Sequence, residues 1–142
     1  VGLERLRAEA GAALAISPSR RTPPAIVALL RDRFRDDPRV FLWDLESENP
    51  YRGILALADR LVVSGDSVSM VSEALCTRHP VEVFDVRSPN HQAFLDRLVA
   101  LGLVRLFDGD PSAPAAKGPV NATAQAAAAV SRLLQARTGS DG

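Results

Sequence analysis

Short apolar runs alternate along this chain with segments in which apolar residues recur every three or four positions. Continuous apolar runs bounded by turn residues are typical of strands buried on both faces, and the longer periodicity is typical of amphipathic helices. We predict strands at residues 12–16, 40–44, 60–64, 81–86 and 103–107, and helices at residues 2–10, 23–34, 51–58, 67–76, 91–101 and 122–136. Strands that alternate with helices on short connections predict a doubly wound parallel α/β sheet with right-handed crossovers.

The centre of the pattern is a strand, turn, helix and strand between residues 58 and 86. Gly65 and Asp66 end the first apolar run, and Val68, Val71 and Leu75 then share one face of the following helix. In such a unit the turn lies at the carboxyl edge of the sheet, where α/β proteins bind ligands. The first amide groups of the helix are also exposed there to an anion.

Length and composition restrict the class of protein. The 142 residues suffice for one domain, residues 1–142, and are too few for two. The 17 basic and 17 acidic side chains cancel, so no overall field attracts nucleic acid or an anionic membrane. A single cysteine, Cys76, and the lack of a long apolar run predict a cytoplasmic protein without a disulfide framework.

The turn after the third strand contains the first group of candidate site residues. Gly65 allows close approach of a ligand to the backbone, and Asp66, Ser67 and Ser69 bring polar groups to the start of a helix whose dipole favours a phosphate. Glu73 lies one turn further, within reach of vicinal hydroxyls such as those of a ribose. The alternative is structural: Asp66 or Ser67 caps the helix, and Glu73 is a solvated side chain.

Two further groups follow other predicted strands. Arg20 and Arg21 stand before a helix and could clamp a phosphate or carboxylate, or could be solvated arginines. His91 and Gln92 could hydrogen-bond sugar hydroxyls, or His91 could help to cap its helix. Because carboxyl ends of parallel strands meet at one edge, we expect all three groups to converge there.

Other kinds of chemistry find no support in the sequence. His79 and His91 have no partners at metal-ligand spacing, so no metal site is expected. Ser67 is in no G-x-S-x-G elbow, and there is no G-x-G-x-x-G or Walker loop. No catalytic residue can be named.

Three stretches carry a family resemblance: SRRTPP at residues 19–24, NPYRGILALADRLVVSGDSVSMVSEAL at residues 49–75 and PVEVFDV at residues 80–86. They resemble the mitochondrial-fission-protein-like family, a largely bacterial family named after a plant protein that helps to recruit dynamin to mitochondria. The family is in turn similar to the carboxyl-terminal half of glycosyltransferase-B enzymes, notably the N-acetylglucosaminyltransferase of peptidoglycan synthesis.

The resemblance implies roles for the candidate residues. Gly65, Ser67, Ser69 and Glu73 occupy places that bind the nucleotide diphosphate and ribose in those enzymes, while His91 and Gln92 look like the counterpart of a motif that contacts the donor sugar. The chain departs from the pattern because it has one Rossmann-like domain and lacks the first strand and glycine loop expected before the helix at residues 2–10. We therefore expect a fragment of a longer two-domain protein, with a vacant central position in its sheet that another segment or chain must fill.

Two functions follow. One is a nucleotide-sugar-binding half of a glycosyltransferase-like enzyme, inactive as this fragment alone, with Arg20 and Arg21 near the leaving diphosphate. It would need no cofactor beyond the nucleoside diphosphate-sugar as substrate. The other is a non-catalytic interaction module of a membrane-division or envelope protein, peripheral at the inner face of the membrane. The donor sugar, acceptor and oligomeric state are not determined by the sequence.

Overall fold

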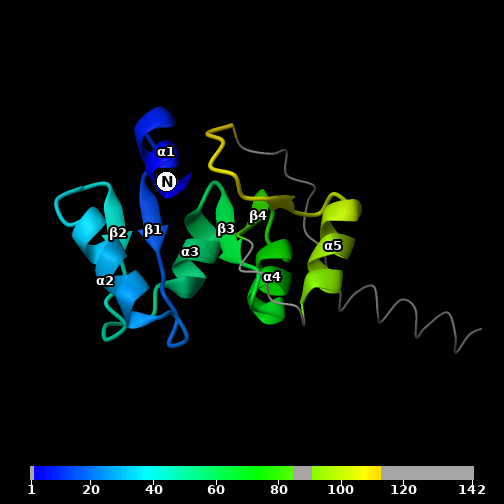
Figure 1. Cartoon of the computed structure of the whole chain (residues 1–142), viewed down its shortest axis with the longest axis horizontal. Coiled ribbons are helices and arrows are strands. Elements are labelled where there is room, and N and C mark those ends of the chain that lie inside the picture. Colours follow the sequence, from blue (N-terminus) through cyan, green and yellow to red (C-terminus); the bar gives the residue numbers. More distant parts are fainter. Residues whose placement is uncertain (1, 85–90, 113–142) are drawn as a thin grey trace, which may run out of the picture.

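The computed structural model of the chain describes residues 2–84 and 91–112 (Figure 1). Helices and parallel strands alternate along these residues. The helices are α1 (Gly2–Glu9), α2 (Pro24–Arg33), α3 (Tyr51–Leu57), α4 (Val68–Leu75) and α5 (Gln92–Ala100). The strands are β1 (Leu14–Ile16), β2 (Val40–Leu42), β3 (Leu61–Ser64), β4 (Val81–Phe84) and β5 (Arg105–Leu106).

The strands form two parallel sheets. One contains β1 and β2, with Ala15 in register with Phe41, and the other has the order β3-β4-β5. Figure 1 shows β2 and β1 on one side of the molecule and β3, β4 and β5 on the other. The predicted alternation and parallel pairing are therefore confirmed, but within the described residues the two groups of strands do not pair into one sheet.

The main core surrounds the β3-β4-β5 sheet. It is built from apolar side chains of the three strands and of α4 and α5: Leu61, Val63, Val71, Ala74, Leu75, Val81, Val83, Leu95, Leu98 and Val104. Helix α4 begins where Ser67 accepts a hydrogen bond from the Met70 amide through its hydroxyl oxygen. The helix turns Val71, Ala74 and Leu75 inward, whereas Val68, expected on this face, is exposed.

Two glycines follow the ends of helices, and a proline begins one. Gly11 and Gly102 follow α1 and α5 with φ near +60°, the left-handed conformation that favours glycine after a helix. Thr22 does not cap α2: Pro23 is the residue before the helix, and the Thr22 hydroxyl accepts a hydrogen bond from the Ser19 amide instead. Proline at the first helical position still starts α2, because its missing N–H would have no partner there.

Two predictions extend beyond the described part of the chain. The predicted strand at residues 81–86 is observed as Val81–Phe84, and its last two positions lie outside the described residues. The predicted helix at residues 122–136 also lies outside them. No helix in the described part is long and apolar enough to cross a membrane.

A buried carboxylate on the central strand β4 links residues at the two strands beside it, β3 and β5. Glu82 has no exposed surface and pairs with Arg60, before β3, and with Arg105 on β5. The two guanidinium groups also donate to the carbonyls of Asp110 and Ser112, at 2.9 and 3.1 Å. A buried charge without partners would be very unfavourable, so this pairing makes Glu82 compatible with the interior and holds the segment after β5 against the sheet.

Candidate functional site

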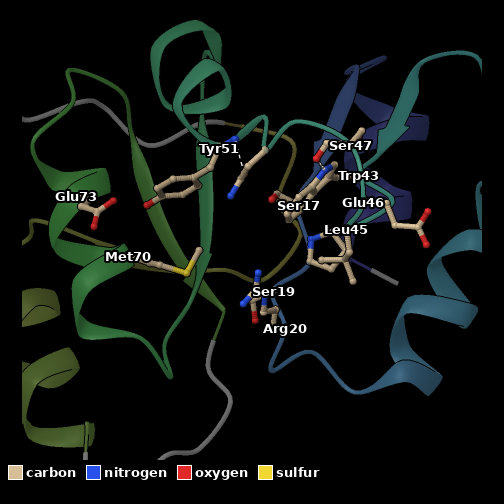
Figure 2. A pocket seen from close by; sticks show the side chains of 12 residues that line it. Ser17, Ser19, Arg20, Trp43, Leu45, Glu46, Ser47, Tyr51, Met70 and Glu73 are labelled. Atoms are coloured by element: carbon tan, nitrogen blue, oxygen red, sulfur yellow. Dashed lines mark hydrogen bonds between the residues drawn. The ribbon is translucent and has the colours of Figure 1, made fainter.

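A crevice of about 570 Å³, lined by polar and apolar groups, lies at the carboxyl ends of β1 and β2 and extends to α3 and α4 (Figure 2). The segment after β1, the segment after β2, the first residue of α3 and one face of α4 form its walls. Its lining residues are Ser17, Pro18, Ser19, Arg20, Trp43, Leu45, Glu46, Ser47, Asn49, Tyr51, Met70 and Glu73. The carboxyl edge of parallel strands is where α/β proteins bind ligands, so this crevice is the candidate site.

Tyr51 and Glu73 meet across the crevice. Figure 2 shows the Tyr51 hydroxyl directed toward the Glu73 carboxylate. The hydroxyl oxygen is buried but has no partner at hydrogen-bond geometry among the described residues. Burial and then the neighbouring carboxylate raise the pKa of Tyr51 to about 12. A phenol that stays protonated and unpaired is available to donate to a ligand oxygen.

Hydrogen bonds restrict the backbone conformation of the turn after β2. Asp44 accepts hydrogen bonds from the Ser47 and Glu46 amides and from the Ser47 hydroxyl, at 2.8 to 2.9 Å, and these bonds lower its pKa to about 2. Leu45, inside this turn, has φ of 72°, the left-handed region that a branched side chain rarely adopts. The Trp43 indole N–H donates to the Ser47 carbonyl. The bonds made by Asp44 and Trp43 hold Leu45 in a strained conformation, a feature often associated with binding sites.

The segment after β1 contributes a positively charged side chain, Arg20, to the crevice. Arg20 lines it, and Arg21 is exposed but is not among the lining residues. The turn is closed by two hydrogen bonds, from the Ser19 amide to the Thr22 hydroxyl and from the Arg21 amide to the Ser19 hydroxyl. Arg20 is therefore the better placed of the two arginines to meet an anion in the crevice.

In the turn between β3 and α4, Gly65 and Ser67 have structural roles. Gly65 is buried, and a Cβ there would lie 3.0 Å or less from the side chains of Leu95 and Val83. Ser67 is 7% exposed and caps α4. One carboxylate oxygen of Asp66 is buried without a hydrogen-bond partner among the described residues, whereas Ser69 is exposed. Close packing and helix capping account for Gly65 and Ser67 without a ligand.

The predicted sugar-binding pair lies at the start of α5. His91 is half-buried and Gln92 is exposed, with its amide donating to Asp96 at 2.9 Å. Of the residues predicted to form the site, Arg20 and Glu73 line the crevice. Ligand binding by all of the predicted residues, including these two, remains a prediction.

Sequence patterns alone did not single out Trp43, Leu45 and Tyr51. Tyr51 was placed with the apolar face of a helix, and Trp43 with a buried strand. Two signals were available. Trp43 and Leu45 follow the carboxyl end of a strand, as Arg20 does. The chain also has one tryptophan and one tyrosine. Aromatic rings, a guanidinium and a carboxylate together can contact a ligand that combines a flat ring, hydroxyls and an anionic group.

The fold and the crevice define the class of protein: a parallel α/β protein with a crevice of mixed polar and aromatic lining at the carboxyl edge of its strands. Residues 1–134 match the family model described as Mitochondrial fission ELM1. The chain belongs to this family.

Two curated relatives support the assignment. The chain is 37% identical over 126 residues to the mitochondrial fission protein ELM1 of Arabidopsis thaliana, a match that covers 86% of this chain and 30% of the plant protein. It is 31% identical over 98 residues to the uncharacterized protein RP120 of Rickettsia prowazekii, covering 66% of this chain and 28% of that protein. The chain thus spans less than a third of the length of either relative. No solved structure matches it.

Proposed function

We propose that this domain is a non-catalytic interaction module of a fission-related membrane-division or envelope protein, working peripherally at the cytoplasmic face of the membrane. The observation that carries the proposal is the family match along residues 1–134, together with 37% identity to a plant mitochondrial fission protein.

The test uses the full-length protein and a dynamin-family GTPase, the kind of partner that the family resemblance implies. We expect the two proteins to co-sediment on anionic vesicles, and we expect Glu73→Ala to leave this unchanged because the module needs no crevice ligand. Absence of the complex, together with turnover of a nucleotide-sugar by the same preparation, would overturn the proposal.

A second candidate function is binding of a nucleoside diphosphate or nucleotide-sugar in the crevice. The specific observation in its favour is that Arg20, Glu73, Trp43 and Tyr51 line one space of about 570 Å³. Glu73 would accept hydrogen bonds from ribose hydroxyls, Arg20 would meet the diphosphate, and an aromatic ring would contact the base. His91 and Gln92 would contact the sugar, and Arg21, Ser67 and Ser69 would add donors for the phosphates.

Trp43 makes this candidate directly measurable, because it is the single tryptophan of these 142 residues and lines the crevice. Uridine diphosphate should change its fluorescence, and Glu73→Ala should weaken binding by about 1–3 kcal/mol, as expected for a lost charge-assisted hydrogen bond. Glu48→Ala is the matched control, because Glu48 is exposed and is not among the residues that line the crevice. If no nucleoside diphosphate changed the fluorescence, the interaction module would be the one candidate function that remains. Turnover in the full-length protein would show a glycosyltransferase-like enzyme.

A further inference from the structure

The Tyr51 hydroxyl is the buried polar group of the crevice whose hydrogen-bonding capacity is unused. Three side-chain atoms of the described residues are buried without a hydrogen-bond partner, and they belong to Arg7, Tyr51 and Asp66. Of these three residues, Tyr51 is the one that lines the crevice. Arg7 has a compensating charge beside it, because its guanidinium group forms an ion pair with Asp37. A buried polar group without a partner is rare in proteins, and a bound ligand can supply the partner that it lacks.

The start of α3 fixes the position of Tyr51. The side-chain oxygen of Asn49 accepts a hydrogen bond from the Tyr51 amide at 3.0 Å, which holds the first residue of the helix. The Tyr51 ring is half-buried, and Figure 2 shows its hydroxyl directed toward the Glu73 side chain on α4. Turning this hydroxyl into solvent would require the ring to leave its half-buried position.

Glu73 gives the Tyr51 hydroxyl a neighbour of opposite hydrogen-bonding character. An ionised carboxylate only accepts hydrogen bonds, whereas a protonated phenol can donate one. Glu73 is exposed, so its carboxylate can turn toward a ligand without disturbing the core. Tyr51 and Glu73 therefore present one donor and one acceptor group side by side on the wall formed by α3 and α4.

These two groups together restrict the class of ligand. A phosphate presents acceptors only, and the Glu73 carboxylate would repel it. An ammonium or guanidinium group presents donors only, and would leave the Tyr51 hydrogen without an acceptor. Two neighbouring hydroxyls can donate to Glu73 and accept from Tyr51 at the same time, because each hydroxyl is both a donor and an acceptor. A vicinal diol is therefore the group that matches both residues.

We propose that Tyr51 is a specificity-determining residue: it recognises one hydroxyl of a ribose bound against Glu73, so that the crevice selects a ribonucleotide over its deoxy analogues. This inference rests on the second candidate function, and adds to it a residue and a selectivity. A ligand without that hydroxyl would leave the Tyr51 donor buried and unpaired. Sites built to bond a hydroxyl reject analogues that lack it for this reason.

The other walls of the crevice leave room for the rest of such a ligand. Arg20 comes from the segment after β1 and Trp43 from the segment after β2, whereas Glu73 comes from α4. The phosphates would meet Arg20 and the base would contact Trp43, while the ribose lies between Tyr51 and Glu73. The anionic end of the ligand is thus directed to a wall other than the one that contains the Glu73 carboxylate.

Calorimetric titration of the full-length protein with uridine diphosphate and its 2′-deoxy and 3′-deoxy analogues tests the proposal. The wild-type protein should bind uridine diphosphate most tightly. The loss of affinity for the analogue without the hydroxyl that Tyr51 recognises should lie between about fivefold and about 150-fold. Tyr51→Phe keeps the ring and removes the hydroxyl. It should reduce the discrimination against one analogue and retain the discrimination against the other, which depends on Glu73.

Two controls separate this selectivity from effects on the fold. Met70→Leu is the matched variant, because Met70 also lines the crevice and leucine is similar in volume, so both affinity ratios should stay unchanged. The urea midpoint of Tyr51→Phe should not fall, because the substitution removes a buried hydroxyl that has no partner in the folded protein.

The possible results distinguish a failure of this inference from a failure of nucleotide binding. Equal affinities of the wild-type protein for the three ligands would overturn the role of Tyr51 and leave nucleotide binding standing. Affinity ratios that Tyr51→Phe leaves unchanged would do the same, whether or not the variant weakens all three ligands by one factor. Absence of binding by any of the three ligands would overturn both the inference and the second candidate function.

Discussion

Gly65 lies against Leu95: a Cβ at Gly65 would come within 2.7 Å of Leu95 Cδ1 and within 3.0 Å of Val83 Cγ1. The chain leaves β3 at this glycine, and the absence of a side chain allows α5 to pack directly on the end of the strand. The glycine that the sequence associates with a ligand therefore has a packing role of its own.

Gly65→Ala should destabilise the protein by about 1–3 kcal/mol, because the added methyl group would force Leu95 and Val83 out of position. Gly53→Ala is the matched control. Gly53 lies within α3 with no atom within 4 Å of its would-be Cβ, and alanine favours helix by about 0.5–1 kcal/mol. Urea unfolding of the two variants should therefore give changes of opposite sign. A neutral Gly65→Ala would contradict the close packing.

Glu82→Gln should cost about 3 kcal/mol, because it leaves the charges of Arg60 and Arg105 facing a buried neutral amide. The pairing with Glu82 raises the pKa of Arg105, and an arginine stays charged at neutral pH even without such a partner, so Arg105 keeps its charge in the variant. Glu9→Gln, which removes an exposed pair with Arg5, should leave stability nearly unchanged, because solvent screens an exposed ion pair. Equal effects of the two substitutions on urea midpoints would mean that Glu82 contributes no more than a surface charge.

The single tyrosine can be titrated by its absorbance at high pH. Tyr51 should ionise near pH 12 rather than at its ordinary value of 10, mainly because of burial and then because of Glu73. Glu73→Gln should lower the midpoint only in part, since burial remains. The folded-state pKa is raised, so the contribution of Tyr51 to stability is complete below pH 10 and is lost as the pH rises toward 12. An ordinary midpoint in the folded protein would place the hydroxyl in solvent.

Ser67→Ala should destabilise the protein by about 1 kcal/mol, the usual loss for a helix cap. Ser69→Ala, two residues further along and exposed, should have little effect on stability. Both variants should be measured by thermal unfolding and by titration with uridine diphosphate. If Ser67→Ala changed binding but not stability, the hydroxyl would serve a ligand rather than α4.

The sequence predicts the element pattern well because local signals determine it. Proline starts α2, and glycines with positive φ end α1 and α5. Val68 was placed wrongly because its burial depends on contacts outside its own segment. Val71, Ala74 and Leu75 fill the interior face of α4, and Val68 is exposed.

The site was less predictable than the fold. Arg20 and Glu73 were identified because each has a charge at a strand end or a helix start. Tyr51 and Trp43 were not identified. A sequence pattern cannot distinguish an aromatic residue in the core from one that lines a crevice. The strained backbone of Leu45 has no sequence signature, since it depends on the hydrogen bonds that Asp44 makes to the following turn.

The uneven burial of the two sheets has a consequence for cooperativity. Most of the buried apolar residues surround β3, β4 and β5, while Leu6 and Val27 are the buried apolar residues of the described part before β3. Residues 1–142 should therefore melt in two stages, with the β1 and β2 pair opening first and the later strands persisting as a separate cooperative unit. Among the described residues, this makes the segment from β1 to β2 the first that a protease should cleave in physiological buffer, even while the β3-β4-β5 sheet is intact.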